Sequence, residues 1–129
     1  MMKALTASKT NIQTYASLET DSLICVTINN TADIGGNYNH EKDTLPIQTR
    51  TGRIQMSPEE FMTTIEAFQP DIFHALCDGD TTESSSKKRT IKSADRSTSF
   101  FIKCLDRFKE SERLKSSLFI GTLFLIYYR

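Results

Sequence analysis

The segment from 23 to 121 alternates between strand-like and helix-like patterns, and this alternation limits the fold more than any other feature. Apolar runs predict strands at 23–28, 71–77 and 117–121, and the first of these runs is rich in β-branched residues. Helical spacing of apolar residues predicts helices at 58–69 and around 94–108. Strands separated by helices are typical of a parallel sheet with right-handed crossovers, so we predict an α/β fold.

The first predicted helix has a clear start and a clear end. Ser57 suits the cap, Pro58 suits the first helical position, and Glu60 completes a capping box. Pro70 ends the helix. Four apolar residues recur at helical spacing and predict a packed face: Phe61, Met62, Ile65 and Phe68.

The remaining elements are predicted from their patterns and boundaries. The run 23–28 is continuously apolar and predicts a strand that is buried on both faces. Residues 45–50 and 53–56 flank Thr51 and Gly52, which predicts a short hairpin. The second helix is predicted to pack through residues at a 3.6 period: Ala94, Ser97, Phe101, Cys104, Leu105 and Phe108.

Composition limits the size and the class of the protein. The chain has 129 residues, whereas a closed eight-stranded α/β barrel typically needs about 250. Sixteen basic and sixteen acidic residues give a net charge of zero, so any RNA contact requires a local patch. Three widely spaced cysteines, Cys25, Cys77 and Cys104, argue against a disulfide framework and against a zinc site, and favour a reducing compartment.

The end of the second predicted strand carries the first candidate site. In parallel α/β folds functional groups gather at the carboxyl ends of strands, which here brings together Cys77, Asp78 and Asp80. These residues are candidates for substrate binding, or the two carboxylates solvate a turn beside Gly79. Cys77 has no histidine at a spacing that would activate it, so we expect a small core residue there.

A basic cluster precedes the second helix and is the candidate for RNA binding. Lys87, Lys88 and Arg89, followed by Lys92 and Arg96, are suited to contact phosphates by charge. The alternative is a solvated loop that leads into the helix, because no aromatic residues for base stacking are interleaved. We predict no metal site: a calcium loop that begins at Asp78 lacks the required glycine and glutamate.

Several separated motifs together resemble one family, the queuine tRNA-ribosyltransferases (tRNA-guanine transglycosylases), and within it the non-catalytic accessory subunits. The motif residues are Gly52-Arg53-Ile54-Gln55-Met56-Ser57-Pro58-Glu59-Glu60-Phe61-Met62, Gln69-Pro70-Asp71-Ile72-Phe73, Cys77-Asp78-Gly79-Asp80, and Lys92-Ser93-Ala94-Asp95-Arg96-Ser97 with Cys104. Catalytic members of the family have an aspartate where this chain has Cys77. The resemblance therefore assigns no catalytic residue to this chain and implies that it is not an enzyme.

The resemblance also implies a fold, partners and a location. The fold would be a partial, incomplete TIM-type (β/α)8 barrel over 21–121, after a weakly ordered lead over 1–20 and before a divergent apolar tail over 122–129. The partner would be the catalytic subunit in a heterodimer that exchanges guanine for queuine at the wobble position of tRNA, and tRNA would be contacted through that complex.

We expect a cytoplasmic protein, with peripheral association with the mitochondrial outer membrane implied by the family. Full-length members carry a zinc site whose ligands have no counterpart here, so no cofactor is expected. Two alternatives for the function remain open. The chain is a truncated product without independent activity, or it sequesters the catalytic subunit.

Overall fold

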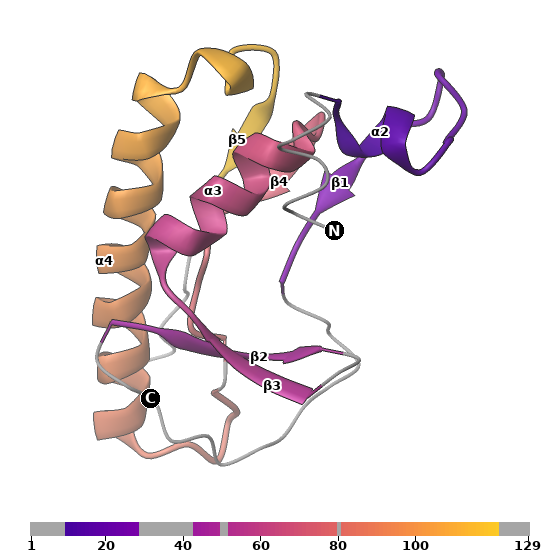
Figure 1. The fold of residues 1–129 in the computed structure, drawn as a ribbon. Helices are drawn as coiled ribbons and strands as arrows, with labels where there is room; N and C mark the ends of the chain where they lie inside the picture. Colours follow the sequence, from indigo (N-terminus) through magenta and orange to yellow (C-terminus); the bar gives the residue numbers. More distant parts are fainter. Residues whose placement is uncertain (1–9, 29–42, 50–51, 80, 122–129) are drawn as a thin grey trace.

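The computed structural model describes residues 10–28, 43–49, 52–79 and 81–121 (Figure 1). Its elements in chain order are α2 (Ile12–Tyr15), β1 (Cys25–Val26), β2 (Leu45–Thr49), β3 (Gly52–Met56), α3 (Pro58–Phe68), β4 (Ile72–His74), α4 (Lys87–Glu110), the 3-10 helix η1 (Glu112–Leu114) and β5 (Leu118–Ile120). The predicted alternation of strands and helices is confirmed, with β1, α3, β4, α4 and β5 as its members.

Three strands form a parallel sheet in the order β1-β4-β5. Ile72 is the partner of Cys25 on one side and of Leu118 on the other. The helix α3 connects β1 to β4 in the chain and α4 connects β4 to β5, and the two helices pack against each other (Figure 1). The sheet is therefore parallel as predicted.

The prediction of a first strand buried on both faces was wrong. The described strand β1 has two residues, Cys25 is exposed, and Leu23 just before it is 76% exposed. Among the described residues β1 is an edge strand with β4 as its neighbour, and no described element covers its outer side. An apolar run alone does not distinguish such an edge from a central strand.

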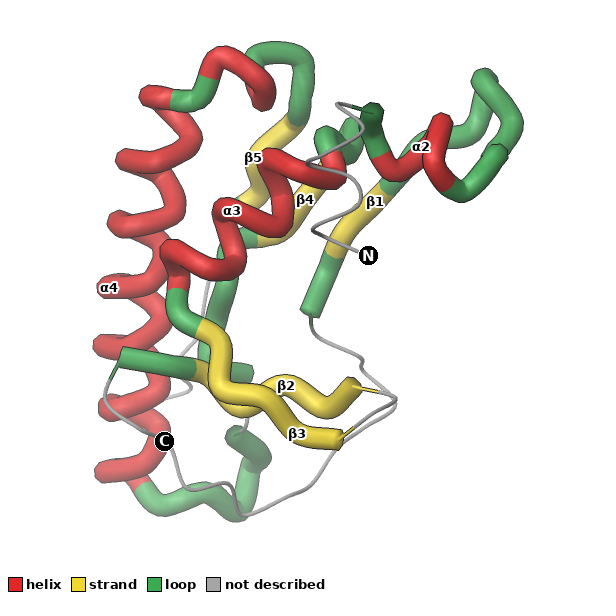
Figure 2. Tube along the Cα trace, viewed as in Figure 1, coloured by secondary structure: helices red, strands yellow, loops and turns green. Residues whose placement is uncertain are grey.

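The predicted hairpin is confirmed and lies apart from the parallel sheet (Figure 2). The strands β2 and β3 pair in antiparallel register, with Thr49 opposite Gly52 at the turn. The Thr49 hydroxyl donates a hydrogen bond to the Gly52 carbonyl over 2.6 Å. Gly52 has φ = +126°, a backbone conformation that side chains with a Cβ rarely adopt.

The capping box of α3 is also confirmed. The Glu60 amide donates to the Ser57 hydroxyl over 3.2 Å, and the Ser57 amide donates to the Glu60 carboxylate over 2.9 Å. At the other end Gln69 adopts the left-handed conformation with φ = 49°, and Pro70 follows. The packed face includes Phe61, Met62 and Ile65 as predicted, whereas Phe68 is only half-buried.

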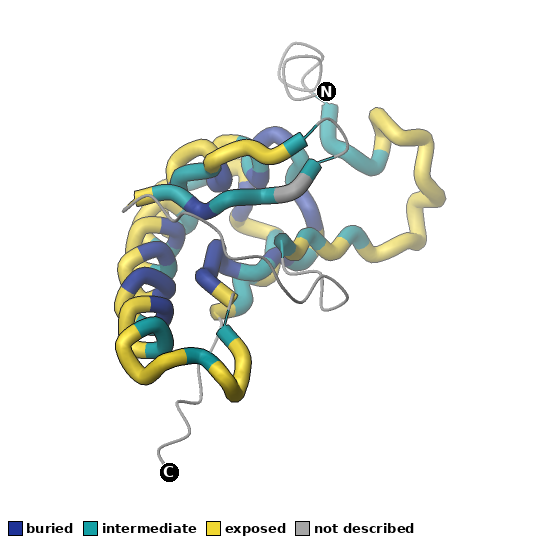
Figure 3. The backbone as a smooth tube through the Cα atoms, turned by 90° about the horizontal axis from the view of Figure 1, so that it is seen from below, coloured by how far each residue is buried: buried dark blue, intermediate teal, exposed yellow. Residues whose placement is uncertain are grey.

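The helix α4 differs from the prediction in its start and in its buried face. It begins after Ser86, whose hydroxyl accepts a hydrogen bond from the Arg89 amide, so the basic cluster is the first helical turn and not a loop. Its buried residues are Ser93, Arg96, Ser97, Phe100 and Cys104. Figure 3 shows the buried stripe on the side of α4 that faces the protein. Only Ser97 and Cys104 of the predicted positions are fully buried.

The core lies between the two long helices, the sheet and the start of the hairpin. Its buried residues are Leu45, Phe61, Met62, Ile65, Phe73, Leu76, Phe100, Cys104 and Leu114. Aromatic rings extend it toward β5: Phe73 lies 5.1 Å from Phe119, and Phe101 stacks on Phe119 at 5.5 Å between ring centroids. Contacts between these rings contribute to stability at this end of the sheet.

Some predictions lie outside the described residues. These are residues 1–9 of the lead over 1–20, Asp80 and the tail over 122–129, so the predicted part boundaries stay predictions. Within the described ranges no helix is long and apolar enough to cross a membrane.

The capping box yields a prediction about stability and pH. Hydrogen bonds from the Ser57 amide and then from its hydroxyl lower the pKa of Glu60, so this contribution is present above the ordinary pKa and is lost as pH falls through the lowered one. Ser57→Ala should reduce the free energy of unfolding by about 1 kcal/mol in urea titrations at pH 7. Glu60→Gln should flatten the loss of unfolding free energy as pH falls below 4.5, the ordinary pKa of the group, and an unchanged pH profile in that variant would argue against the box.

Candidate functional site

The chain segment that follows β4 runs into the interior. Leu76 and Asp78 are fully buried, and Cys77 is 4% exposed. The Ala75 amide donates to the Ile120 carbonyl over 2.9 Å, which continues the pairing with β5 just past the end of β4. This strand end is therefore packed on all sides, and Cys77 is the small core residue that we predicted.

Asp78 is held by two arginines of α4. Both guanidinium Nη atoms of Arg89 donate to its carboxylate, over 2.7 Å to Oδ1 and 3.1 Å to Oδ2. Arg96 lies on the same carboxylate, with its Nη1 3.6 Å from Oδ2. Removing a carboxylate from water is costly unless it is paired and hydrogen-bonded, and the two-pronged contact with Arg89 satisfies this condition.

Two serines of the same helix bind the backbone of Asp78. The Asp78 amide donates to the Ser97 hydroxyl over 2.9 Å, and the Ser93 hydroxyl donates to the Asp78 carbonyl. Arg89, Ser93, Arg96 and Ser97 are spaced four, three and one residues apart, so they share one face of α4. We call Asp78 and these four residues the Asp78 clamp.

The clamp corrects the predictions for the strand end and for the basic cluster. Asp78 neither solvates a turn nor lies open to a substrate, because its exposed fraction is zero. Arg96 faces inward at 7% exposure and is not at the surface for phosphate contact in this structure. Lys87 and Lys88 are exposed on the first turn of α4, while Arg89 turns inward.

Two clamp residues, Ser93 and Ser97, had no functional interpretation from their own positions in the sequence, and Arg96 was interpreted only as a phosphate contact. Ser93, Arg96 and Ser97 lie on the same helical face as Phe100 and Cys104, which predicts that they are buried. Polar residues on a buried face need partners, and the acidic strand end that precedes the helix offers a carboxylate. Polar residues on the buried face of a helix, together with an acidic strand end before it, are the sequence signal from which these contacts could have been predicted.

The other buried cysteine is also unsuited to nucleophilic chemistry. Burial raises the pKa of Cys104, and a hydrogen bond to the Leu76 backbone opposes this shift only in part. Its side chain is fully buried in the core beside the strand end. A thiol in such surroundings stays protonated and acts as a small apolar residue.

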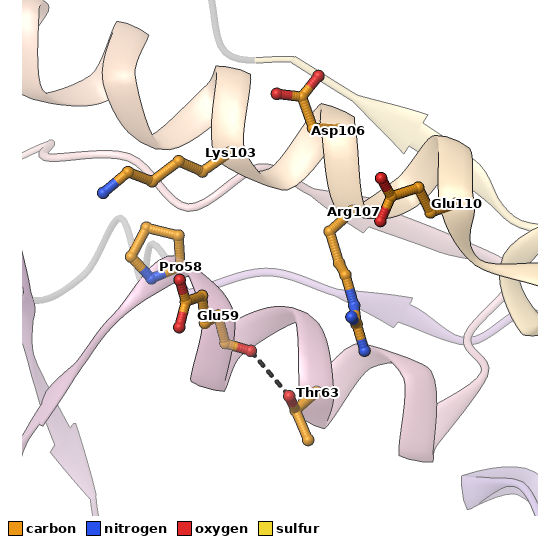
Figure 4. Close-up of a pocket in the computed structure, with 7 residues that line it drawn as sticks. All are labelled: Pro58, Glu59, Thr63, Lys103, Asp106, Arg107 and Glu110. Carbon is orange, nitrogen blue, oxygen red and sulfur yellow. Dashed lines mark hydrogen bonds between the residues drawn. The ribbon is translucent and has the colours of Figure 1, made fainter.

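A groove of about 460 Å³ lies between α3 and α4, and no clamp residue lines it (Figure 4). Its lining is Pro58, Glu59, Thr63, Lys103, Asp106, Arg107 and Glu110. Arg107 donates to the Glu66 carboxylate over 3.0 Å, and this contact raises the pKa of the arginine. The side chains carry both signs of charge and mostly face solvent, which is typical of ion pairs between two surface helices.

A search of the described ranges finds no group of three or more histidine, cysteine or acidic side chains placed to hold a metal ion. The predictions of substrate contact at Asp80 and of RNA contact at Lys87 and Lys88 are not tested by this geometry.

Comparisons with known proteins point to one family. A family model described as queuine tRNA-ribosyltransferase matches residues 6–123. A protein of Anopheles gambiae named queuine tRNA-ribosyltransferase accessory subunit 2 is 51% identical over 81 residues, which are 63% of this chain and 19% of the relative. A protein of the same name from Culex quinquefasciatus is 42% identical over 65% of this chain and 20% of the relative. The protein of that name from Drosophila mojavensis is 36% identical over 69% of this chain and 21% of the relative. The matched segment thus spans about a fifth of each relative.

The clamp predicts a large loss of stability when Asp78 is replaced by an uncharged residue of similar size. Asp78→Asn should lower the free energy of unfolding by about 3 kcal/mol or more, because two arginines would lose the charge that compensates them in a buried setting. The matched control is Asp95→Asn, which removes an exposed carboxylate from α4 and should change stability by less than about 0.5 kcal/mol. Equal effects of the two substitutions in urea unfolding would contradict a structural role of Asp78.

Proposed function

The chain belongs to the queuine tRNA-ribosyltransferase family, and from this membership we propose that it forms part of a non-catalytic accessory subunit. The complex it serves would exchange guanine for queuine at the wobble position of tRNA. The relatives named accessory subunit 2 support this assignment. The chain's share of that role would be structural: it presents a rigid strand end and helix pair within the complex.

The observation that carries the proposal is the chemistry of the strand end. The family resemblance places the aspartate of catalytic members at Cys77, and a buried thiol is not an equivalent base. The neighbouring Asp78 carboxylate has no exposed surface and is bound by Arg89 through both oxygens. Two charged hydrogen bonds hold this carboxylate inside the protein, which supports a structural role for Asp78 over contact with a substrate.

The proposed fold of the whole accessory subunit is a TIM-type barrel of which this chain supplies a part. The sheet order β1-β4-β5, with α3 and α4 as the connecting helices, supports two successive strand–helix units of such a barrel. Two exposed isoleucines of α4, Ile91 and Ile102, and exposed Leu118 on the edge strand β5 would then lie against further parts of the barrel. The relatives, about five times as long as the matched segment, have the length for those parts.

The proposed partner is the catalytic queuine tRNA-ribosyltransferase subunit, with tRNA bound by the complex as a whole. A purified chain should co-elute with that subunit in size-exclusion chromatography. By itself it should incorporate no labelled guanine into tRNA above a protein-free control. When the chain is added to the catalytic subunit, incorporation of labelled guanine should still require the nucleophile of the catalytic subunit.

Two results would overturn the proposal. Guanine exchange by the isolated chain would show that the chain retains enzymatic activity. The Asp78→Asn variant would then test whether the strand end is responsible for that activity. Separate elution of the two proteins at micromolar concentration, with both shown to be folded by circular dichroism, would refute the proposed binding to the catalytic subunit.

A further inference from the structure

Among the described residues, the edge strand β5 leaves the backbone of Phe119 without a partner in the sheet. β5 lies at one edge of the parallel sheet, on the side of α4, and β4 is its described neighbour (Figure 2). The Leu118 amide donates to the Asp71 carbonyl over 2.7 Å, and the Ala75 amide donates to the Ile120 carbonyl over 2.9 Å. Successive residues of a strand turn their amide and carbonyl to opposite sides, so those of Phe119 point away from β4.

The side chains at this edge are apolar on both faces of the strand. Leu118 is 57% exposed on one face. On the other face the half-buried Phe119 ring stacks on Phe101 of α4. An open edge with apolar side chains is a template for pairing with a further strand. A strand that fits here needs apolar side chains on both of its own faces, one beside Phe119 and one beside Leu118.

The segment 122–129, which follows β5 directly, has this composition. It lies outside the described residues, and its sequence is Thr-Leu-Phe-Leu-Ile-Tyr-Tyr-Arg. Six consecutive residues, 123–128, are apolar or aromatic, and one residue of the segment is charged. A short run without polar alternation is typical of a strand that is covered on both faces.

We propose that the segment 122–129 folds back and pairs in antiparallel register with the outer edge of β5. A four-residue loop over 120–123, a common length in hairpins, places Phe124 opposite Phe119 as a hydrogen-bonded pair. Leu125 then lies opposite Leu118 as the next, non-hydrogen-bonded pair. In this register Phe124 joins the rings around Phe119, and Leu125 covers the most exposed side chain of β5.

Gly121 is suited to the loop of this hairpin. A Cβ at Gly121 would lie 2.7 Å from Cε2 of Phe101, a distance at which one of the two groups must shift. The chain therefore leaves β5 close to the Phe101 ring, where a glycine permits the approach. This is the side of β5 on which Phe124 joins the aromatic rings in the proposed register.

The inference goes beyond the proposed function. In the barrel proposed above, the next parallel strand would take the outer edge of β5, so that pairing and the pairing with 122–129 exclude each other. In the chain by itself, the segment 122–129 covers the edge. A strand from elsewhere can pair with β5 only after this segment has left.

Hydrogen exchange of the Phe119 amide tests the pairing in the full ¹⁵N-labelled chain by NMR. The amide should exchange about tenfold or more slowly than in an unstructured chain, because it donates to Phe124. Phe124→Pro removes the amide that bonds back to Phe119 and should raise its exchange rate about tenfold. The matched control is Leu125→Pro, whose amide points away from β5, where an edge strand tolerates proline, so the rate should change less than about threefold.

A pair of introduced cysteines tests the register. In a Cys25→Ser background, which removes the exposed thiol, Leu118→Cys and Leu125→Cys should form a disulfide within one chain. The two thiols are oxidised while one molecule of oxidised glutathione is reduced to two thiols. Leu118→Cys with Ile126→Cys is the control, because residue 126 faces the other side of the strand, and its yield in peptide maps should be about fivefold lower.

Three results would overturn the pairing: exchange of the Phe119 amide at the rate of an unstructured chain, equal effects of the two proline variants, or equal yields from the two cysteine pairs. Protection that rises with protein concentration between about 10 and 200 μM, or a disulfide between chains, would assign the edge to a second copy and would also overturn it.

The Ile72 amide serves as the internal reference for folding. It donates to the Ile24 carbonyl over 3.0 Å inside the sheet, so it should stay protected in every folded variant. If a proline variant loses this protection, the cysteine pairs decide the question. Failure of the pairing leaves the proposed function intact, because binding to the catalytic subunit is measured separately by co-elution.

Discussion

The contact between Asp78 and α4 fixes how the long helix lies on the sheet. A carboxylate with no exposed surface requires its charge partners at defined positions, and Arg89 and Arg96 supply them two turns apart. The two serine hydroxyls bind the backbone of the same residue, so the first half of α4 cannot slide along the strand end. The second half then places Phe100 and Cys104 in the core.

This arrangement explains why an acidic strand end in an α/β fold is a structural feature here. The position where such folds carry catalytic groups is occupied by Cys77 in the core and by Asp78 inside an ion pair. Three residues of the α4 motif, Ser93, Arg96 and Ser97, contact Asp78. In this chain the motif and the strand end therefore form one unit, in which a buried charge is paired.

Local signals were sufficient for much of the fold. The capping box at Ser57, the hairpin with Gly52 at its turn and the parallel order of three strands all follow from residues close together in the chain or from general rules of connection. The buried side of α4 was not predicted correctly, because Ser93 and Arg96 resemble surface residues until a partner 15 or 18 positions earlier is known. The strand β1 was predicted, but its exposure was not, since burial depends on neighbouring elements and not on the apolar run itself.

A double-mutant cycle between Asp78 and Arg89 measures the central contact directly. Asp78→Asn, Arg89→Met and the double variant are compared with the parent chain in urea unfolding at pH 7. The structure predicts that the effects are not additive and that the coupling free energy is about 2 kcal/mol in favour of the native pair. A coupling below about 0.3 kcal/mol would show that the two residues act independently, and Asp78 would again be a candidate for substrate contact.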